Sequence, residues 1–223
     1  MTVSNTEVTR RRSAREEILA TAYELFTQRG IRAVGVDEVI AKSGVAKATL
    51  YKHFRSKNDL ARAFLDQREQ RWSRDFIEAG SAERADDPEG QLLAIFDMLD
   101  EWYLRNDSFR ERSFMSVLLE MGTGHPVGQA CVQHLANLRT MVATRAAAAG
   151  LTEPQDFALS FHILMEGSII LASEGDRRAA LRSKEMARAL IDKHRPPGKV
   201  KARRPPARHA PANHRTPEHK LQS

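Results

Sequence analysis

The feature that most constrains this chain is the helical spacing of its apolar residues. From residue 13 to residue 194, apolar side chains return at three- and four-residue steps, and no window shows the sustained alternation of a β-strand. The clearest stripe, within 126–149, consists of Val127, Cys131, His134, Leu135, Leu138, Met141 and Val142. The spacing therefore predicts an all-α fold.

Capping signals and glycines divide this stretch into about nine helices. Three pairs have the spacing of a capping box, namely Ser13 with Glu16, Ser56 with Asp59, and Thr152 with Gln155. Glycines 30, 44, 80 and 150 are expected to end helices. The predicted helices lie between Ser13 and Gly30, over 36–43 and 47–53, between Ser56 and Gly80, and over 90–105, 108–121, 126–149, 153–173 and 177–194.

The composition is that of a globular protein with one or two domains. The chain has 223 residues, of which 41% are hydrophobic and 29% are charged. It has no run of eighteen apolar residues, and no apolar stretch follows the basic N-terminus, so neither a membrane span nor a signal peptide is expected. The single cysteine, Cys131, is typical of a reducing compartment. We expect a cytoplasmic protein.

The formal net charge of +6 is unevenly distributed. Residues 195–223 contain eight Lys or Arg and one Glu, and residues 1–57 contain eleven Lys or Arg and six Asp or Glu, so an acidic body lies between two basic ends. Basic ends favour a polyanionic partner such as nucleic acid. The tail 195–223 also holds six of the nine prolines and is predicted to be disordered. It is either an inert extension or a phosphate-neutralising arm.

The stretch "GVAKATLYKHFRSKNDL", residues 44–60, has the pattern of a helix-turn-helix. Helices 36–43 and 47–53 flank a turn in which Gly44 can adopt a left-handed conformation. Apolar residues face inward, and the side chains left outward are Lys47, Thr49, Tyr51, Lys52 and His53. These donate to phosphates and base edges, and a helix of about seven residues (~10 Å) fits a major groove ~12 Å wide. The alternative is a solvated helical hairpin.

The segment "ILATAYELFTQRGIRAVGVDEVIAKSGVAKATLYKHFRSKNDL" resembles the DNA-binding domain of the tetracycline-repressor (TetR) family of bacterial transcription regulators. The resemblance covers residues 13–65. It implies an all-helical homodimer with a three-helix DNA-binding domain, a ligand-sensing domain, and a palindromic operator from which a small molecule releases the protein. The matching positions place Lys47, Thr49, Tyr51 and His53 at DNA contacts, and Lys57 at a phosphate contact.

Two departures from the family pattern concern helix caps. Val34 and Gly35 stand where relatives commonly have Thr or Ser, and Ala46 stands where they often have Ser. A lost cap costs about 1 kcal/mol.

The expected domains are an N-terminal arm (1–12), the helix-turn-helix domain (13–56), a ligand-sensing and dimerisation domain (57–194), and the basic tail (195–223). The dimer is expected to form through the last two helices, 153–194.

The acidic body is rich in aromatic and methionine side chains. Ordinary core packing explains them residue by residue, whereas the resemblance favours an effector pocket with a bulky apolar ligand. The candidate pocket residues are Trp72, Phe76, Met98, Trp102, Phe114, Met115, Leu118, His134, Phe161 and Met165. Polar candidates to orient a ligand are Glu120, His125, His162 and Glu166, although the last two could instead belong to the dimer interface.

Nothing in the sequence indicates an enzyme, a cofactor or a metal site. The chain contains no HExxH, GxSxG or paired CxxC motif. The segment "GTGHPVG" (122–128) lies between predicted helices rather than after a strand, so it is a weak phosphate-loop candidate. We therefore expect a ligand-responsive transcriptional repressor that binds double-stranded DNA. The alternative is an architectural DNA-binding protein without an effector, and the sequence does not separate a repressor from an activator.

Overall fold

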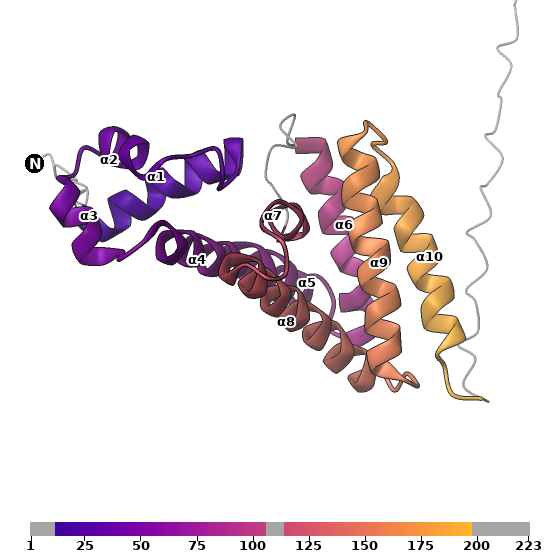
Figure 1. Cartoon of the computed structure of the whole chain (residues 1–223). Helices are drawn as coiled ribbons and strands as arrows, with labels where there is room; N and C mark the ends of the chain where they lie inside the picture. Colours follow the sequence, from indigo (N-terminus) through magenta and orange to yellow (C-terminus); the bar gives the residue numbers. More distant parts are fainter. Residues whose placement is uncertain (1–11, 106–113, 198–223) are drawn as a thin grey trace, which may run out of the picture.

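The computed structural model describes residues 12–105 and 114–197. Every regular element in these ranges is a helix, as predicted, and counting the continuous helix 57–84 once gives nine helices. A small lobe of α1–α3 lies at one end of the molecule, and α9 and α10 lie at the other (Figure 1). The predicted N-terminal arm, most of the predicted basic tail, and the beginning of the predicted helix 108–121 lie outside the described residues.

The small lobe consists of α1 (Ala14–Arg29), α2 (Val36–Ser43) and α3 (Lys47–His53). These bounds confirm the predicted ones. Ser13 and Glu16 form the predicted reciprocal capping box at the start of α1. Leu25 and Phe26 of α1 are buried in the lobe's core together with residues of α2 and α3.

A single long helix leads out of this lobe. It comprises α4 (Lys57–Arg68), a π-helical segment η1 (Glu69–Ala79) and α5 (Gly80–Arg84). The prediction that Gly80 ends this helix is wrong, because Gly80 has helical dihedral angles (φ −62°, ψ −32°). A Cβ at this position would lie 2.6 Å from the Cε atom of Met98, so the glycine permits close packing against α6 rather than a stop. At the start of the long helix, the side-chain oxygen of Ser56 accepts a hydrogen bond from the backbone N–H of Asp59.

The π-helical segment coincides with a four-residue repeat of mostly buried positions in the sequence. Phe64, Arg68, Trp72 and Phe76 form one row along the helix, and Leu65, Glu69, Ser73 and Ile77 form the next. Four residues exceed one α-helical turn, so such rows wind slowly around an α-helix. The wider turns of a π-helix oppose this drift. Both rows can therefore continue along the interior of the protein past Arg68.

The remaining helices form the body. They are α6 (Pro88–Arg105), α7 (Phe114–Met121), α8 (Pro126–Ala148), α9 (Pro154–Ser173) and α10 (Ala179–Lys193). The predicted Thr152 cap of α9 is wrong. Glu153 occupies the N-cap position with a left-handed backbone (φ 51°), and the Thr152 hydroxyl donates to the carbonyl of His194 at 3.0 Å. Thr152 thus ties the start of α9 to the end of α10.

The body and the small lobe share part of their hydrophobic core. One buried cluster combines α1–α4 with residues of α7 and α8, including Phe114, Val117 and Leu135. A second cluster combines η1, α6, α8, α9 and α10. Trp72 packs against both. Consequently α7 belongs to the same buried cluster as α1–α4, although it lies far from them in the sequence.

Among the described residues, one helix, α9, is long and apolar enough to cross a membrane by length and composition alone. Of its most apolar 18-residue window, 39% is buried inside the protein. A core helix meets the same criteria, and α9 packs on the second core cluster through Phe157, Phe161 and Met165.

Candidate DNA-binding and effector sites

Helix α3 is anchored by one side and presents the other to solvent. Leu50 is buried, which is worth about 1.5–3 kcal/mol, and it holds a seven-residue helix that is too short to be stable alone. Tyr51 is 42% exposed, Lys47, Lys52 and His53 are exposed, and Thr49 is half-buried. The structure thus places all five predicted readers on one short helix.

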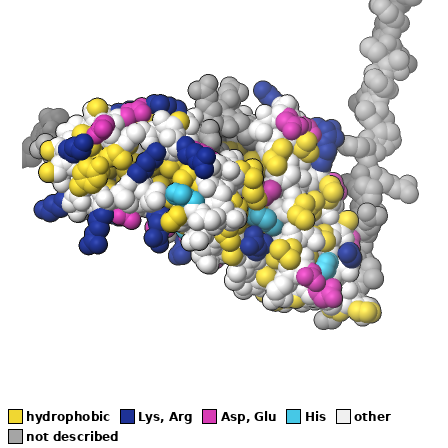
Figure 2. Space-filling view, viewed as in Figure 1, with side chains coloured by type: hydrophobic (Ala, Val, Ile, Leu, Met, Phe, Trp, Pro, Cys, Tyr) yellow, Lys and Arg dark blue, Asp and Glu magenta, His cyan; other side chains and the backbone are white. Residues whose placement is uncertain are grey.

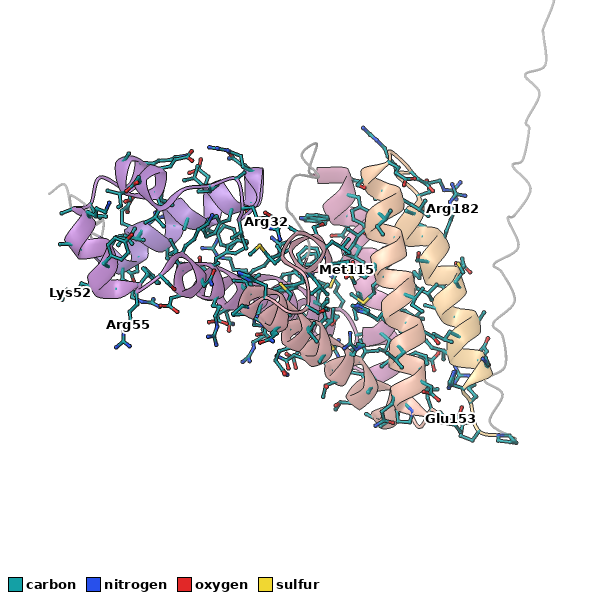
Figure 3. All side chains as sticks on the ribbon, in the orientation of Figure 1. Arg32, Lys52, Arg55, Met115, Glu153 and Arg182 are labelled. Atoms are coloured by element: carbon teal, nitrogen blue, oxygen red, sulfur yellow. The ribbon has the colours of Figure 1, made fainter. Side chains whose placement is uncertain are left out.

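The tip of α3 projects away from the body. Lys52 and the exposed Arg55, just beyond α3, extend from the end of the small lobe (Figure 3). Lys and Arg side chains stand out around this lobe in Figure 2. Arg55 was not among the predicted contacts. It stands directly after α3, the helix that carries the predicted contacts.

The turn and the caps are as the sequence indicated. Gly44 is left-handed (φ 69°), and its backbone N–H donates to the carbonyl of Ile40 at 3.1 Å. Gly35 and Ala46 occupy the N-cap positions of α2 and α3, and neither helix has a side-chain cap. The first N–H groups of α3 are therefore left to solvent or to a phosphate.

Two predicted phosphate donors have protein partners in this structure. The Nζ atom of Lys47 lies 3.2 Å from Oδ1 of Asp37, and Nζ of Lys57 donates to the carbonyl of Arg32 at 3.3 Å. Partial burial lowers the pKa of Lys57, and the charge of Glu120 opposes this shift. Asp37 thus sits beside the proposed DNA surface as a competing acid.

A small cavity of about 20 Å³ lies where the long helix meets the body. Its walls come from α4, η1, α6, α7, α8 and α9, and its lining residues are Arg68, Trp72, Trp102, Phe114, Leu135, Leu138, Glu166 and Ile169. Such a volume holds about one water molecule. Trp72 and Trp102 meet edge to face, with ring centroids 5.0 Å apart.

Three of the ten predicted pocket residues, Trp72, Trp102 and Phe114, line this cavity. Phe76 stacks on Trp72 and His134 stacks on Phe114, with centroids 5.0 Å and 5.2 Å apart. Phe76 and His134 thus contact lining residues without lining the cavity themselves. The other five predicted residues lie elsewhere: Met98 packs near Gly80, Phe161 and Met165 belong to the second core cluster, and Met115 and Leu118 pack on the first.

Sequence reasoning missed Arg68, Leu135, Leu138 and Ile169 as pocket-lining residues. Arg68 had a detectable signal, because it stands four residues before Trp72 in the buried row of the long helix. His162 and Glu166 were predicted to lie either in the pocket or at the dimer interface. Of the two, Glu166 lines the cavity. His162 does not line it, although it is buried.

His134 belongs to a polar cluster rather than to the cavity itself. Its Nδ1 atom lies 2.5 Å from Oε2 of Glu69, and Nε2 lies 3.5 Å from Oδ1 of Asp66. Asn137 donates to Oε1 of Glu69 at 2.7 Å. This cluster joins α8 to the α4–η1 junction, beside an open groove of about 900 Å³ that both Glu69 and Asn137 line. The described residues contain no group of acids, His and Cys arranged to hold a metal ion.

Exposed apolar side chains mark the outer surface of the last two helices. They are Leu159, Ile163, Ile170 and Leu171 of α9, with Leu181 and Met186 of α10. Leu159, Ile163 and Ile170 repeat at helical spacing and form one stripe. These two helices are the ones predicted to form the dimer.

Helix α7 reaches the small lobe through a hydrogen bond. The carboxylate of Glu120 accepts from the backbone N–H of Arg32, in the loop between α1 and α2, at 2.7 Å. Phe114, at the other end of α7, lines the cavity. Met115 on α7 and Arg32 are labelled in Figure 3. One short helix therefore contacts both the small lobe and the cavity.

A basic recognition helix on a three-helix lobe, joined to a helical body with an interior cavity, defines a helix-turn-helix regulator. Comparisons with known proteins agree. The profile of the "Bacterial regulatory proteins, tetR family" matches residues 18–64. The chain belongs to the TetR family of bacterial transcriptional regulators, in which a DNA-binding helix-turn-helix is shared and homodimers are typical.

Individual relatives are similar mainly over the small lobe. The transcriptional activator FasR of Mycolicibacterium smegmatis is 43% identical over 53 residues, 24% of each chain. The transcriptional repressor KstR2 of Mycobacterium tuberculosis is 33% identical over 92 residues, 40% of this chain and 45% of that one. The chain thus matches less than half the length of these relatives, and they differ in the sign of regulation.

A solved structure extends the similarity to most of the chain. SCO4454, a TetR-family transcriptional regulator from Streptomyces coelicolor, has a TM-score of 0.72 and 26% identity, covering 81% of this chain and 89% of that one. A regulator from Saccharomonospora viridis solved in complex with choline has a TM-score of 0.60 and 21% identity, covering 80% of this chain and 95% of that one. At 21% identity that likeness concerns the fold alone.

Proposed function

We propose that this protein is a cytoplasmic, ligand-responsive repressor that binds a palindromic operator as a homodimer and leaves it when a small apolar or amphipathic molecule binds. The observation that carries this proposal is the position of α7. It shares a buried cluster with the helices of the small lobe, is bonded to the loop at Arg32, and also forms a wall of the cavity.

DNA recognition is assigned to the exposed surface of α3. Tyr51 and His53 read base edges, and Lys47, Thr49, Lys52 and Lys57 bind phosphates or groove edges. Arg55 adds a phosphate contact from the adjoining turn. A good base-edge contact is worth about 1–3 kcal/mol of discrimination.

The size of the cavity supports a mechanism of release. Ligand pockets in proteins measure about 300–1,000 Å³, so a cavity of about 20 Å³ cannot admit an effector while its walls stay in place. The effector must therefore favour a conformation in which wall helices have moved. Since α7 is bonded to the loop at Arg32, its movement shifts the DNA-reading lobe.

Dimerisation is assigned to α9 and α10. Their exposed apolar stripe would be buried in a four-helix bundle with the same helices of a second copy. Such a dimer presents two small lobes, and each α3 would read one half-site in successive major grooves, spaced by one helical turn or a multiple.

Selection of bound sequences from a random DNA pool tests the proposal. The expected product is an inverted repeat, protected by a dimer. Tyr51→Ala should abolish its binding while leaving helicity and dimerisation intact, and Glu174→Ala, an exposed change at the far end of α9, serves as the matched control. Recovery of a single, unrepeated half-site bound by monomer would contradict the dimeric assignment. Equal binding by Tyr51→Ala would contradict the assignment to α3.

A further inference from the structure

The cavity contains a buried permanent cation. Arg68, the last residue of α4, is 3% exposed and lines the cavity with its side chain. Its guanidinium carbon lies 5.8 Å from the ring centroid of Phe114. A guanidinium cannot shed its proton in a protein, so its charge persists in this apolar setting at every accessible pH.

Among the described residues that line this cavity, the acidic one is Glu166 of α9. Burial raises the pKa of this carboxyl, and the charge of Arg68 opposes the shift. The other lining side chains are apolar or aromatic: Trp72, Trp102, Phe114, Leu135, Leu138 and Ile169. The cavity therefore pairs a fixed cation with a carboxylate whose ionised form is penalised by its surroundings.

We propose that the effector is an amphipath with a single carboxylate, which binds the Arg68 guanidinium inside this cavity while its apolar part lies against the tryptophans and aliphatic walls. The planar guanidinium suits the two oxygens of a carboxylate. The carboxyl of Glu166 lines the same cavity, and its charge interacts with that of Arg68, so it competes with a ligand carboxylate. This inference rests on the proposed function, since it names the ligand class of the proposed effector site.

Other head groups suit the cavity less well. An ammonium group would meet the like charge of Arg68 in a setting with little solvent screening, and its only acidic partner among the described lining residues is Glu166, whose ionised form burial disfavours. An alcohol would take up a single hydrogen bond and gain no charge interaction. The ligand's charge thus decides between otherwise similar amphipaths.

The position of Arg68 also connects the head group to DNA binding. Arg68 is the last residue of the α4 segment of the long helix. The first residue of that segment, Lys57, donates a hydrogen bond to the carbonyl of Arg32. Arg68 faces Phe114, the first residue of α7, whose other end carries Glu120. A carboxylate drawn to Arg68 therefore acts on both elements that hold the small lobe.

The two tryptophans of the chain make a direct test possible. The sequence contains only Trp72 and Trp102, and both line the cavity, so intrinsic tryptophan fluorescence reports on this site. The full-length protein is titrated with decanoate, decan-1-ol and decylamine, which share one chain and differ in head group, below their aggregation concentrations. Decanoate should bind at least about tenfold more tightly than decanol, as one charged hydrogen-bonded contact implies, and decylamine should bind most weakly.

Three variants locate the preference. Arg68→Met should reduce the decanoate-to-decanol affinity ratio to about one, and Glu166→Gln should increase decanoate affinity by about tenfold with decanol unchanged within about twofold. Arg62→Met, an exposed change on the same helix, should leave the ratio as in the parent protein. Far-ultraviolet circular dichroism of each variant tests for retained folding, and Glu166→Gln keeps the test decisive if Arg68→Met is unfolded.

The outcomes separate this inference from the proposed function. The carboxylate assignment is overturned if decanoate gives no saturable fluorescence response. It is also overturned if the preference for decanoate over decanol survives in Arg68→Met. Operator release by decanol with no dependence on Arg68 also overturns it and leaves the proposed ligand response standing. If decanoate binds with the expected dependence on Arg68 but never changes operator affinity, the ligand class stands and the proposed release fails.

Discussion

The carboxylate of Glu120 accepts a hydrogen bond from the backbone N–H of Arg32 at 2.7 Å, across 88 positions of the sequence. This contact fastens the end of α7 to the loop between α1 and α2. It lies beside Lys57, whose charge Glu120 also supports. The bond thus connects the small lobe directly to a helix that borders the cavity.

Replacing Glu120 with Ala is expected to loosen this connection. The variant should lose about 1 kcal/mol of unfolding free energy, because a backbone N–H loses a charged acceptor at a partly exposed site. The effector-induced loss of operator affinity should shrink by at least about twofold, while effector binding measured by tryptophan fluorescence is retained. Leu119→Ala, an exposed neighbour on α7, is the control. An undiminished response in Glu120→Ala would show that coupling runs through the apolar contacts of α7 alone.

A second prediction concerns Asp37, which pairs with Lys47 at the proposed DNA surface. Asp37→Asn removes an acid from the path of the phosphates and releases Lys47 to bind one. Affinity for operator and for random DNA should both rise, and the salt dependence should steepen by about 0.9 for each phosphate newly neutralised. The lost first-turn acid costs α2 about 0.3–1 kcal/mol.

Titrating DNA affinity against salt concentration measures this effect. Asp156→Asn changes the matching first-turn acid of α9, far from the small lobe, and should alter helix stability alone. An unchanged salt slope in Asp37→Asn would mean that Lys47 does not reach the DNA backbone.

The small lobe could be predicted almost completely from the sequence, because its signals are local. The capping box at Ser13, the left-handed turn at Gly44 and the inward Leu50 each depend on a few neighbouring residues, and all three are present. The bounds of α2 and α3 follow directly from them. The outward side of α3 was equally predictable, since one buried position in seven residues fixes which side is exposed.

The body was less predictable because its decisive contacts are long-range. Gly80 has the local pattern of a helix stop, but its role is set by Met98 on another helix. Thr152 has the pattern of a cap, but its hydroxyl bonds to His194. For the cavity, residue type alone cannot separate a wall from ordinary core, so Phe161 and Met165 were named and Arg68 was missed.

The bare N-terminus of α3 gives a third prediction. Ala46 occupies the N-cap with an extended backbone (φ −67°, ψ 146°), and no side chain caps the helix. Ala46→Ser should increase the free energy of unfolding by about 1 kcal/mol, because the hydroxyl accepts from an N–H that is otherwise left to solvent. Chemical denaturation followed by circular dichroism measures it.

Ala48→Ser provides the comparison, since it places the same hydroxyl inside α3, where it cannot cap and costs a few tenths of a kcal/mol. Equal effects of the two serines would show that the cap position carries no special benefit.

A fourth prediction concerns pH and His162. This side chain is buried, and among the described residues neither ring nitrogen has a hydrogen-bond partner. Burial, with a smaller contribution from the charge of Arg139, lowers the pKa of His162 to about 4. In the unfolded chain the pKa of a histidine is about 6.5. As pH falls from about 6.5 to 4, His162 therefore becomes protonated in the unfolded chain but stays neutral in the folded protein. The free energy of unfolding declines as a result.

This group alone contributes a loss of up to about 3 kcal/mol across that range. His162→Leu should remove it, so the difference in unfolding free energy between variant and parent should grow in the variant's favour as pH falls. Denaturation at several pH values between 4 and 7 measures the difference, in which the titration of Glu166 and other acids largely cancels. A difference that stays constant with pH would mean that the pKa of His162 is the same in the folded and the unfolded protein.

The last prediction concerns the basic C-terminal segment, and the structure determines where to cut it. Arg195 lies beyond the boundary expected from composition, but its Nη2 atom lies 2.7 Å from Oε2 of Glu89. Deleting residues 198–223 leaves that ion pair in place. The deleted segment contains seven Lys or Arg and one Glu, a net +6 that equals the formal charge of the whole chain. If the segment neutralises phosphates, its removal should weaken binding to operator and random DNA by similar factors. The salt dependence should also flatten by about 0.9 per lost contact. Operator preference should persist because α3 remains, and an unaltered salt slope would show that the segment does not bind DNA.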